Sequence, residues 1–555
     1  MPHISLSFID WVIIALYFAV ILAVGFYLRR FASTGEDFFL AGRRNSSWVA
    51  GLAFLSANLG ALEILGWTGG TYQYGIYAAH FYWIGAIPAM LFLGLYMMPF
   101  YYSGRIHSIP GYLRLRFDEK TRVLNGFSFA IMTLLVSGIN LYSMALVLNT
   151  FLGWNWDACM WVSAATVACY VTLGGLLSAI FTEIVQFFLI WFGLFLVSIL
   201  GIIEIGGFDE IFARLPENMG RLWATSSDPA RNAMGVTWPG IVLGLGFVLS
   251  FGYWTTDFLV VQRAFSSKDL RSARMTPILA SFFKMALPFI VVVGALVAWK
   301  LANSGDGSFQ LLRNEKGDLI FDSALPLLVA RYYPEGLIGL GITALLAGFM
   351  AGQAGNISAF NTVWTYDIYH SVINRKASDA HLVWMGRVST LAGIFISVGT
   401  AYWAKSFPSI MDYMQAIFSW VNAPLFATML LAMFSKRITS AGAFYGLIIG
   451  MLSSFLLFLG LKFNWFSAYY VTFSEHPGEM SNNLWRAWWA WLATFCCTVL
   501  ISLFTKPKPD GELVGLVKGL TEIKEEKGRA WRNSLYLWAG ISLIVLIVLN
   551  IYFWG

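Results

Sequence analysis

Long apolar runs recur along the chain, separated by short polar or charged stretches that contain Gly, Pro and Ser. A bilayer core of roughly 30 Å takes about 20 apolar residues of α-helix, and each run is close to that length. The pattern predicts about fourteen transmembrane helices, at residues 7–29, 48–72, 79–102, 122–153, 156–176, 178–206, 236–262, 276–300, 336–369, 383–404, 409–434, 439–462, 484–505 and 533–554. The short alternating segments of a membrane β-barrel are not seen. The predicted fold class is an all-α polytopic membrane protein.

The composition agrees with lipid as the main solvent. Of 555 residues, 58% are hydrophobic and only 12% are charged, which is too apolar for a water-soluble chain of this length. The first run, from Phe8 to Leu28, lacks a basic leader and a cleavage signal, so we expect it to be a retained helix. The four cysteines lie in apolar runs without metal-ligand spacing, and no phosphate loop or appended domain is expected. The composition predicts no cofactor.

The distribution of Lys and Arg predicts the orientation of the chain. Odd-numbered loops are basic, and the seventh is predicted to include Arg263, whereas the segments outside the first and last helices carry neither Lys nor Arg. Basic loops stay in the cytoplasm, so both termini are expected outside it, in the cell membrane. The same rule explains the net charge of +6 without a nucleic acid partner. The last basic loop, 506–532, is expected to be a solvated cytoplasmic connector, with a regulatory or lipid-binding arm as the alternative.

Two predicted helices contain residues that favour a break within the membrane. The run from Ser56 to Ala61 interrupts the second helix just before Glu63, and a weaker interruption at Ser250 to Gly252 lies in the seventh. An unwound stretch exposes carbonyls that can bind a cation, and the half-helix ends provide dipoles for a solute. Close helix packing through small residues is the alternative explanation.

The spacing of the two interruptions suggests an internal repeat. Because they lie five helices apart, we predict inverted repeats at about 48–206 and 236–434 within a single transporter domain. The helices outside these repeats would be additions, at 7–29, 439–462, 484–505 and 533–554.

Four ionisable residues, Glu63, Glu183, Asp257 and Lys284, lie well inside apolar runs. A charge in the membrane interior is costly, so each is a functional candidate whose partner has to be found. Buried ion pairs that only hold helices together are the alternative. An enzyme is not expected, because the six histidines are sparse and no catalytic constellation can be assembled.

Several motifs occur in combination along nearly the whole chain. They are Asp37–Arg44, Ser56–Asn58, Gly174–Gln186, Tyr253–Trp254 with Val261–Arg263, and Asp367–Tyr369. In this combination the chain resembles the sodium:solute symporter family, which includes sodium/glucose, sodium/proline and sialic-acid transporters. The resemblance implies a LeuT-like 5+5 inverted repeat, and the sugar-transporting members have fourteen helices with both termini outside.

The resemblance also implies a solute pocket at the membrane midplane, closed towards the cytoplasm by an aromatic gate. Four positions match the sugar-transporting bacterial members: the gate Tyr253, its neighbour Trp254, the pocket Lys284 and the pocket Gln415.

Other pocket positions differ from those members. Glu63 replaces a glutamine, Phe81 and Tyr82 replace a Tyr-Glu pair, and Ser250 replaces an asparagine. Exchanging an amide for a carboxylate changes donors into acceptors and adds a charge. A sugar, a polyol, a sugar derivative or a cationic solute is therefore compatible with the predicted pocket.

The coupling ion is a separate question. The resemblance implies a sodium site made of backbone carbonyls at Ser56 and Leu59 together with two hydroxyls, and this chain has Ala351 and Gly352 at the hydroxyl positions. Sodium prefers oxygen ligands, so their loss weakens the predicted site.

Three explanations stay open for the missing hydroxyls. A shift of the alignment would let Asn356 or Ser358 supply oxygen, Glu183 could act as a ligand, or protons could replace sodium. Glu63 or Glu183 could carry such a proton if burial raises its pKa.

We expect a secondary active symporter that lies in the lipid bilayer and carries a small polar solute by alternating access. The coupling ion would be sodium, or else a proton. An uncoupled carrier and a non-transporting sensor or subunit are the alternatives.

Overall fold

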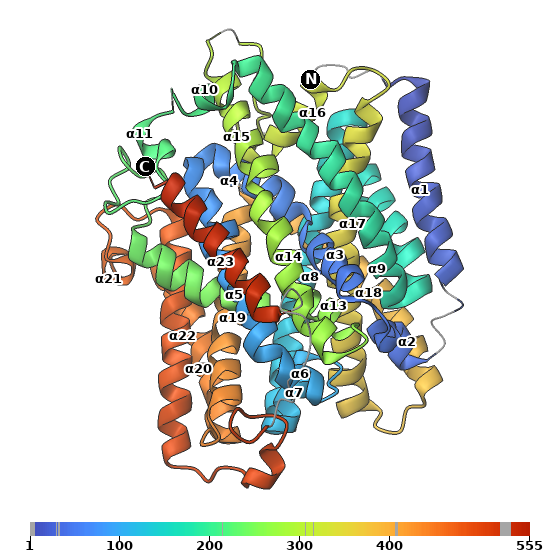
Figure 1. Cartoon of the computed structure of the whole chain (residues 1–555), viewed down its shortest axis with the longest axis vertical. Helices are drawn as coiled ribbons and strands as arrows, with labels where there is room; N and C mark the ends of the chain where they lie inside the picture. Colours follow the sequence, from blue (N-terminus) through green and yellow to red (C-terminus); the bar gives the residue numbers. More distant parts are fainter. Residues whose placement is uncertain are drawn as a thin grey trace.

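The computed structural model describes residues 6–28, 30, 34–213, 215–305, 307–314, 316–405, 409–521 and 534–554. Most of these residues are helical, and extended pairing among them is limited to two isolated bridges, Asn45 with Ser267 and Arg313 with Leu319. Figure 1 shows long helices packed together, with short helices across their ends. The predicted all-α class is confirmed.

Each predicted span is helical over most of its length. The long helices are α1 (Phe8–Leu28), α8 (Glu119–Leu152), α9 (Trp156–Ile205), α14 (Leu270–Ala286), α15 (Pro288–Ala302), α17 (Ile338–Thr362), α18 (Asp379–Ala404), α19 (Ile410–Phe434), α20 (Ser440–Lys462), α22 (Glu479–Leu503) and α23 (Leu535–Tyr552). Among the described residues, eleven helices are long and apolar enough to cross a bilayer, or twelve if one bent pair is a single span. The predicted count of fourteen is not confirmed, because the second predicted span is divided into short halves and the fifth is joined to the sixth.

The remaining elements are shorter. They are α2 (Gly35–Leu40), η2 (Ala41–Arg43), η4 (Gly75–Phe81), η5 (Tyr82–Ala86), α5 (Ile87–Phe92), η6 (Leu93–Met97), α6 (Met98–Ser103), α7 (Ile109–Arg116), α10 (Phe208–Phe212), α11 (Glu217–Gly220), η8 (Phe321–Ser323), α16 (Ala324–Tyr332), η9 (Val363–Ile373), α21 (Tyr469–Thr472) and η10 (Asp510–Leu513). The run from η4 to α6 forms the third predicted helix, with π-helical turns at η5 and η6 that widen it locally.

The first predicted break is confirmed. Helix α3 (Ser47–Asn58) ends before Leu59 and Gly60, and helical structure resumes as η3 (Leu62–Gly66) and α4 (Trp67–Tyr74). Asn140 of α8 accepts a hydrogen bond from the Ala61 N–H through its Oδ1, at 2.9 Å. A side chain from another helix therefore satisfies backbone that the break leaves unpaired.

The second break lies further along the chain than predicted. Residues Ser250–Thr256 form a regular helix, α12, that follows η7 (Gly240–Leu249), and the chain bends by 47° between Thr256 and α13 (Phe258–Phe265). The Asp257 carboxylate accepts a hydrogen bond from the Leu259 N–H at 2.9 Å and so caps α13. The prediction of a break at Ser250 to Gly252 was wrong, because the capping carboxylate and not the small residues ends the helix.

Helix α9 contains a kink that separates two of the predicted spans. Gly175 has φ 58° and ψ −153°, and a Cβ there would lie 2.6 Å from the carbonyl oxygen of Phe38. Only glycine fits both the backbone angles and the close approach of α2.

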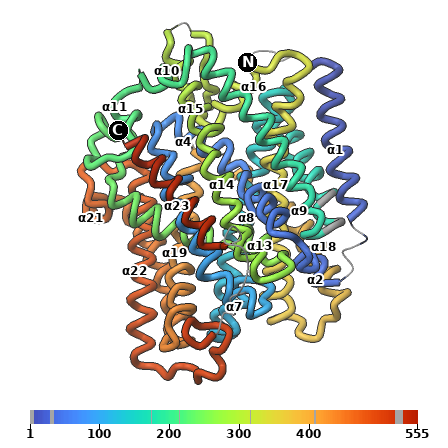
Figure 2. The backbone as a smooth tube through the Cα atoms, viewed as in Figure 1, coloured from blue at the N-terminus to red at the C-terminus, as the bar shows by residue number. Residues whose placement is uncertain are grey.

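Three of the helices predicted as additions lie at the edges of the molecule, and the fourth, α23, crosses the front of the bundle in Figure 2 and packs against α14 and α5. Figure 2 traces α1 along one edge, where it packs against α9 and α17, and α20 beside α22 at the opposite edge. Asp10 of α1 accepts hydrogen bonds from the N–H groups of Gly336 and Gly339 and so ties α1 to the start of α17. The boundaries of the inverted repeats stay a prediction.

The first part of the predicted connector is packed rather than solvated. Leu513 and Val517 are buried, the Lys518 N–H donates to the Met433 carbonyl at 2.8 Å, and the Tyr112 hydroxyl donates to the Leu516 carbonyl at 2.7 Å. The rest of the connector, from residue 522 to 532, lies outside the described residues.

Candidate functional site

Two charged side chains meet beside the break between α3 and η3. Glu63 is in the first turn of η3, and Lys284 comes from the end of α14; both are buried. The Lys284 Nζ lies 2.7 Å from Glu63 Oε2 and donates to Asn58 Oδ1 at 2.6 Å. It also lies 4.8 Å from the ring centre of Tyr82 and 5.1 Å from that of Trp254. The ammonium group is therefore held by a carboxylate, an amide and two aromatic faces.

Asn58 links this pair to the second broken helix. Its Nδ2 donates to the Tyr253 hydroxyl at 2.9 Å, and Tyr253 belongs to α12. The Tyr82 hydroxyl donates to the Glu63 carbonyl at 3.2 Å. A continuous chain of polar contacts thus joins α3, η3, α14 and α12 in the middle of the bundle.

A small cavity of about 40 Å³ lies against these groups. Its lining consists of Leu62, Glu63, Trp67, Phe81, Leu245, Leu249, Ser250, Tyr253, Trp254, Gln415 and Phe418. Such a volume holds little more than a water molecule, so the cavity is too narrow for a larger solute in this conformation.

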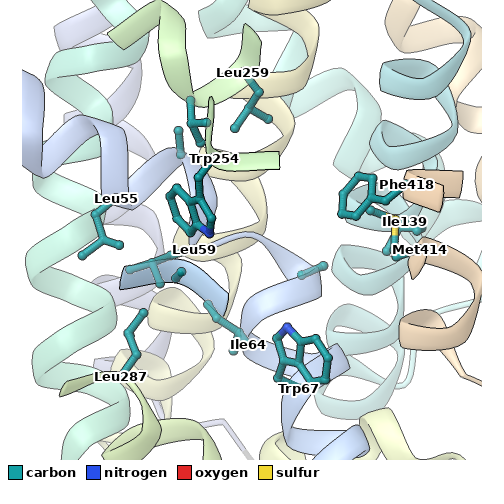
Figure 3. Close-up of a cluster of buried hydrophobic side chains, with 14 of the residues drawn as sticks. Leu55, Leu59, Ile64, Trp67, Ile139, Trp254, Leu259, Leu287, Met414 and Phe418 are labelled. Carbon is teal, nitrogen blue, oxygen red and sulfur yellow. The ribbon is translucent and has the colours of Figure 1, made fainter. Parts of the chain in front are cut away.

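Aromatic rings form the walls of the cavity. Trp67 and Phe81 lie with ring centres 3.6 Å apart, and Tyr253 contacts both Trp254 and Phe418 with ring centres 5.2 and 5.3 Å away. Figure 3 shows Trp254 and Trp67 above and below the broken helix, and Phe418 facing them from α19. The site is apolar at its walls and polar at one corner, as small-molecule sites commonly are.

The structure brings the predicted solute residues together. Six of them line the cavity: Glu63, Phe81, Ser250, Tyr253, Trp254 and Gln415. The other two, Tyr82 and Lys284, lie directly behind Glu63. Their role as solute ligands stays a prediction.

Sequence reasoning missed three residues of this site. Asn58 stood in a family motif but was given no contact, and Trp67 and Phe418 were not singled out. Trp67 lies four residues after Glu63 and Phe418 three residues after Gln415, so helical periodicity places each pair on one face. That spacing could have identified both aromatic residues.

Two glycines of α17 pack closely against the predicted ion site. A Cβ on Gly348 would lie 2.8 Å from the Leu59 carbonyl oxygen, and a Cβ on Gly352 would lie 2.7 Å from the Gly60 Cα. The Ser56 carbonyl accepts from the Leu59 N–H at 2.9 Å. Helix α17 therefore approaches the break through bare backbone, and neither Ala351 nor Gly352 offers a side-chain oxygen.

The residues proposed as replacements have partners of their own. The Asn356 Nδ2 donates to the Gly352 carbonyl at 3.0 Å, and the Ser358 hydroxyl donates to Gln262 Oε1 at 3.0 Å.

Glu183 pairs with a cation from the protein itself. Arg263 donates to both carboxylate oxygens, from Nε to Oε2 at 3.2 Å and from the other nitrogen, NH2, to Oε1, and both side chains are fully buried. The assignment of Arg263 to a cytoplasmic loop was wrong, because α13 continues to Phe265 and keeps it inside the bundle. A Cβ on Gly355 would lie 3.4 Å from both Arg263 and Ala57, so this guanidinium lies next to the helix break.

Two broken helices that meet at a narrow, partly polar cavity among membrane-spanning helices are the arrangement expected of a solute carrier. The chain belongs to the sodium:solute symporter family, whose sequence model matches residues 38–450. The resemblance found in the motifs is thereby confirmed, and the family is one of transporters rather than enzymes.

Individual relatives agree over most of the chain. The sodium/glucose cotransporter 1 of Sus scrofa is 27% identical over 549 residues, which cover 93% of this chain and 82% of the relative. The sodium/glucose cotransporter of Vibrio parahaemolyticus is 28% identical over 478 residues, which cover 83% of this chain and 86% of the relative.

A solved structure agrees with the fold. The substrate-bound, outward-open structure of a Na⁺-coupled sialic acid symporter matches with a TM-score of 0.74 at 19% identity, covering 91% of this chain and 99% of that one. The predicted LeuT-like fold is confirmed by this likeness.

Proposed function

We propose that this protein carries a small, neutral, hydroxyl-rich solute such as a sugar across the membrane by sodium-coupled symport. The observation that carries the proposal is the Glu63–Lys284 pair at the narrow cavity between the two broken helices. Family membership and relatives named sodium/glucose cotransporters support it.

The charge of the pair favours a neutral solute. Glu63 and Lys284 neutralise each other, so a solute with a net charge would leave one buried charge uncompensated. Hydroxyl groups can donate to the carboxylate and accept from the ammonium without that cost. The rings of Trp67, Phe81 and Tyr253 offer apolar faces for the carbon skeleton of the same solute.

The size of the cavity supports alternating access. A volume of about 40 Å³ cannot hold a sugar, so the walls must separate before the solute enters. The breaks at Leu59–Gly60 and Asp257 give each side of the cavity a hinge where half of a helix can rotate.

A second candidate is coupling by protons, or by no ion at the first helix break. The approach of Gly352 to Gly60 and the pairing of Glu183 with Arg263 favour it. In this arrangement the Arg263 guanidinium, rather than a bound ion, supplies the positive charge next to the broken helix.

Uptake by purified protein in liposomes separates the two candidates. A thermal-shift screen of sugars, polyols and amino acids, run in sodium and in potassium, first identifies the solute. Labelled solute is then offered with an inward sodium gradient, an inward proton gradient or no gradient. Accumulation with sodium alone, abolished by a sodium ionophore, is the expected result.

Accumulation driven only by the proton gradient would favour the second candidate. Equilibration without accumulation, or no uptake of any solute that stabilises the protein, would overturn symport.

A further inference from the structure

A second, larger groove lies away from the solute cavity, between α19, α20 and α22, with α8 and α18 on its far side. Its volume is about 770 Å³, and most of its lining is apolar, including Leu135, Trp420, Phe455 and Phe458. Phe455 and Phe458 are 46% and 38% exposed, so the groove opens sideways at the surface of the bundle.

Arg486 of α22 lines this groove with a buried positive charge. The residue is 3% exposed, its Nε donates to the Ser419 hydroxyl at 2.9 Å, and its NH2 nitrogen donates to Asn483 Oδ1 at 2.8 Å. No salt bridge in the described part of the chain includes Arg486. Buried charges are normally neutralised, so this guanidinium favours an anionic group in the groove.

Lys462 provides a second cation, which lies near the same Phe458 ring as Arg486. Its Nζ lies 5.8 Å from the ring centre of Phe458, and the Arg486 Cζ lies 5.2 Å from that centre. Asp412 and Glu479 also line the groove, and Asp412 Oδ1 is buried without a hydrogen-bond partner. Two cations and two carboxylates together give no net charge, which matches a ligand that carries both a phosphate and an ammonium.

The position of the groove along the helices matches one leaflet of a bilayer. Lys462 ends α20 and Glu479 begins α22, so the charged end lies where helices leave the membrane. Trp420 lies about 15 Å along α19 from Ile410 at 1.5 Å per residue, which is half of a bilayer core of roughly 30 Å. The apolar end therefore reaches the depth at which an acyl chain ends.

We infer that this groove binds a zwitterionic phospholipid with an aminoethyl headgroup. Its phosphate lies between Arg486 and Lys462, its ammonium faces Asp412 and Glu479, and one acyl chain lies on Phe455 and Trp420. Bound lipid would neutralise Arg486 and hold the peripheral helices α20 and α22 against α19.

Native mass spectrometry of the full-length protein, with defined lipids added in detergent, tests the inference. Phosphatidylethanolamine is expected to remain bound at energies that remove phosphatidylglycerol and phosphatidylcholine. Lys462→Gln should weaken its retention about tenfold, the size expected for one charge-assisted contact. Phe455→Trp should weaken it by filling the groove, and both residues are exposed enough for folding to be unaffected.

Matched variants outside the groove provide the control. Lys268→Gln removes an exposed lysine from the loop before α14, and Phe192→Trp enlarges a residue of α9 that is 73% exposed. Both should retain the lipid as the wild type does.

Equal retention of the three lipids, or no difference between groove and control variants, would overturn the inference. Binding of a soluble sugar or of a second copy of the chain in the groove would also overturn the inference, if that binding is lost in Lys462→Gln and Phe455→Trp. None of these readouts depends on transport.

Discussion

The ammonium of Lys284 lies 2.7 Å from Glu63 Oε2, so a charge just after the first helix break is neutralised by a charge from α14. Pairing lowers the cost of placing two ionised groups in the membrane interior, and Glu63 also lines the cavity. A structural ion pair and a binding site are therefore not alternatives here, because the same two side chains can serve both purposes.

Removing one member of this pair should destabilise the protein. Glu63→Gln or Lys284→Met leaves an uncompensated buried charge, at an expected cost of about 3–5 kcal/mol in unfolding free energy. The double variant should recover most of that loss, while solute binding stays abolished. Thermal unfolding in detergent and ligand-induced shifts measure the two effects separately. Solute binding by the double variant at wild-type strength would contradict the proposed role of the pair.

Loss of the hydrogen bond between Asn58 and Tyr253 should loosen the narrow cavity. Tyr253→Phe keeps the ring but removes the contact of 2.9 Å, which is worth about 0.5–1.5 kcal/mol. Solute exchange in liposomes should become several-fold faster than in the wild type.

The matched control for this change is Tyr101→Phe. It removes a buried hydroxyl that donates to the Thr255 carbonyl at 2.9 Å, outside the cavity lining. Stability should fall by a similar amount without faster exchange, and equal acceleration in both variants would refute a specific gating role.

The sequence contains the local causes of much of this architecture. Apolar length predicts the helices, and the small polar run from Ser56 to Ala61 predicts the first break because such residues hold helical structure weakly. Glu63 stands out because a carboxylate in an apolar run is costly. These are properties of single segments, which a sequence displays directly.

The sequence does not contain the partners of those groups. The proximity of Arg263 to Glu183 depends on how far α13 extends and on how α9 and α13 both pack against α3. Neither can be read from charge patterning, which assigned the arginine to a loop. The second break shows a different limit. Small residues at Ser250 to Gly252 and a capping carboxylate at Asp257 both favour a break, and only packing decides between them.

The glycine contact between α17 and the first helix break should be sensitive to one methyl group. In Gly352→Ala the new Cβ would lie 2.7 Å from the Gly60 Cα and 2.8 Å from Asn140 Oδ1, so backbone would have to move. We expect a loss of about 1–3 kcal/mol in stability. Gly399→Ala in α18 is the control, because a Cβ there meets no atom within 4 Å and alanine favours helix. Comparable melting temperatures for the two variants would show that the break has room for side-chain atoms.

Asp322 should make stability depend on pH. This residue lies in η8, outside the membrane spans, and its Oδ1 would contact a Cβ placed on Gly69 of α4. Burial raises the pKa of Asp322 from its ordinary 3.8 to about 7. A hydrogen bond from the Ile410 backbone lowers this pKa in part, and the charge of Asp412 adds to the rise. The folded state thus binds a proton more tightly than the unfolded state.

The sign of the effect follows from this difference. Below pH 3.8 the carboxyl is neutral in both states; as pH rises towards 7 only the unfolded state ionises, so stability falls and stays lower above pH 7. The two pKa values limit the loss to roughly 4 kcal/mol. Asp322→Asn keeps the shape of the side chain without the titration, so its melting temperature should fall less between pH 5 and pH 8 than that of the wild type. At pH 8 the variant should be the more stable protein; a parallel fall in both proteins would place the pH dependence elsewhere.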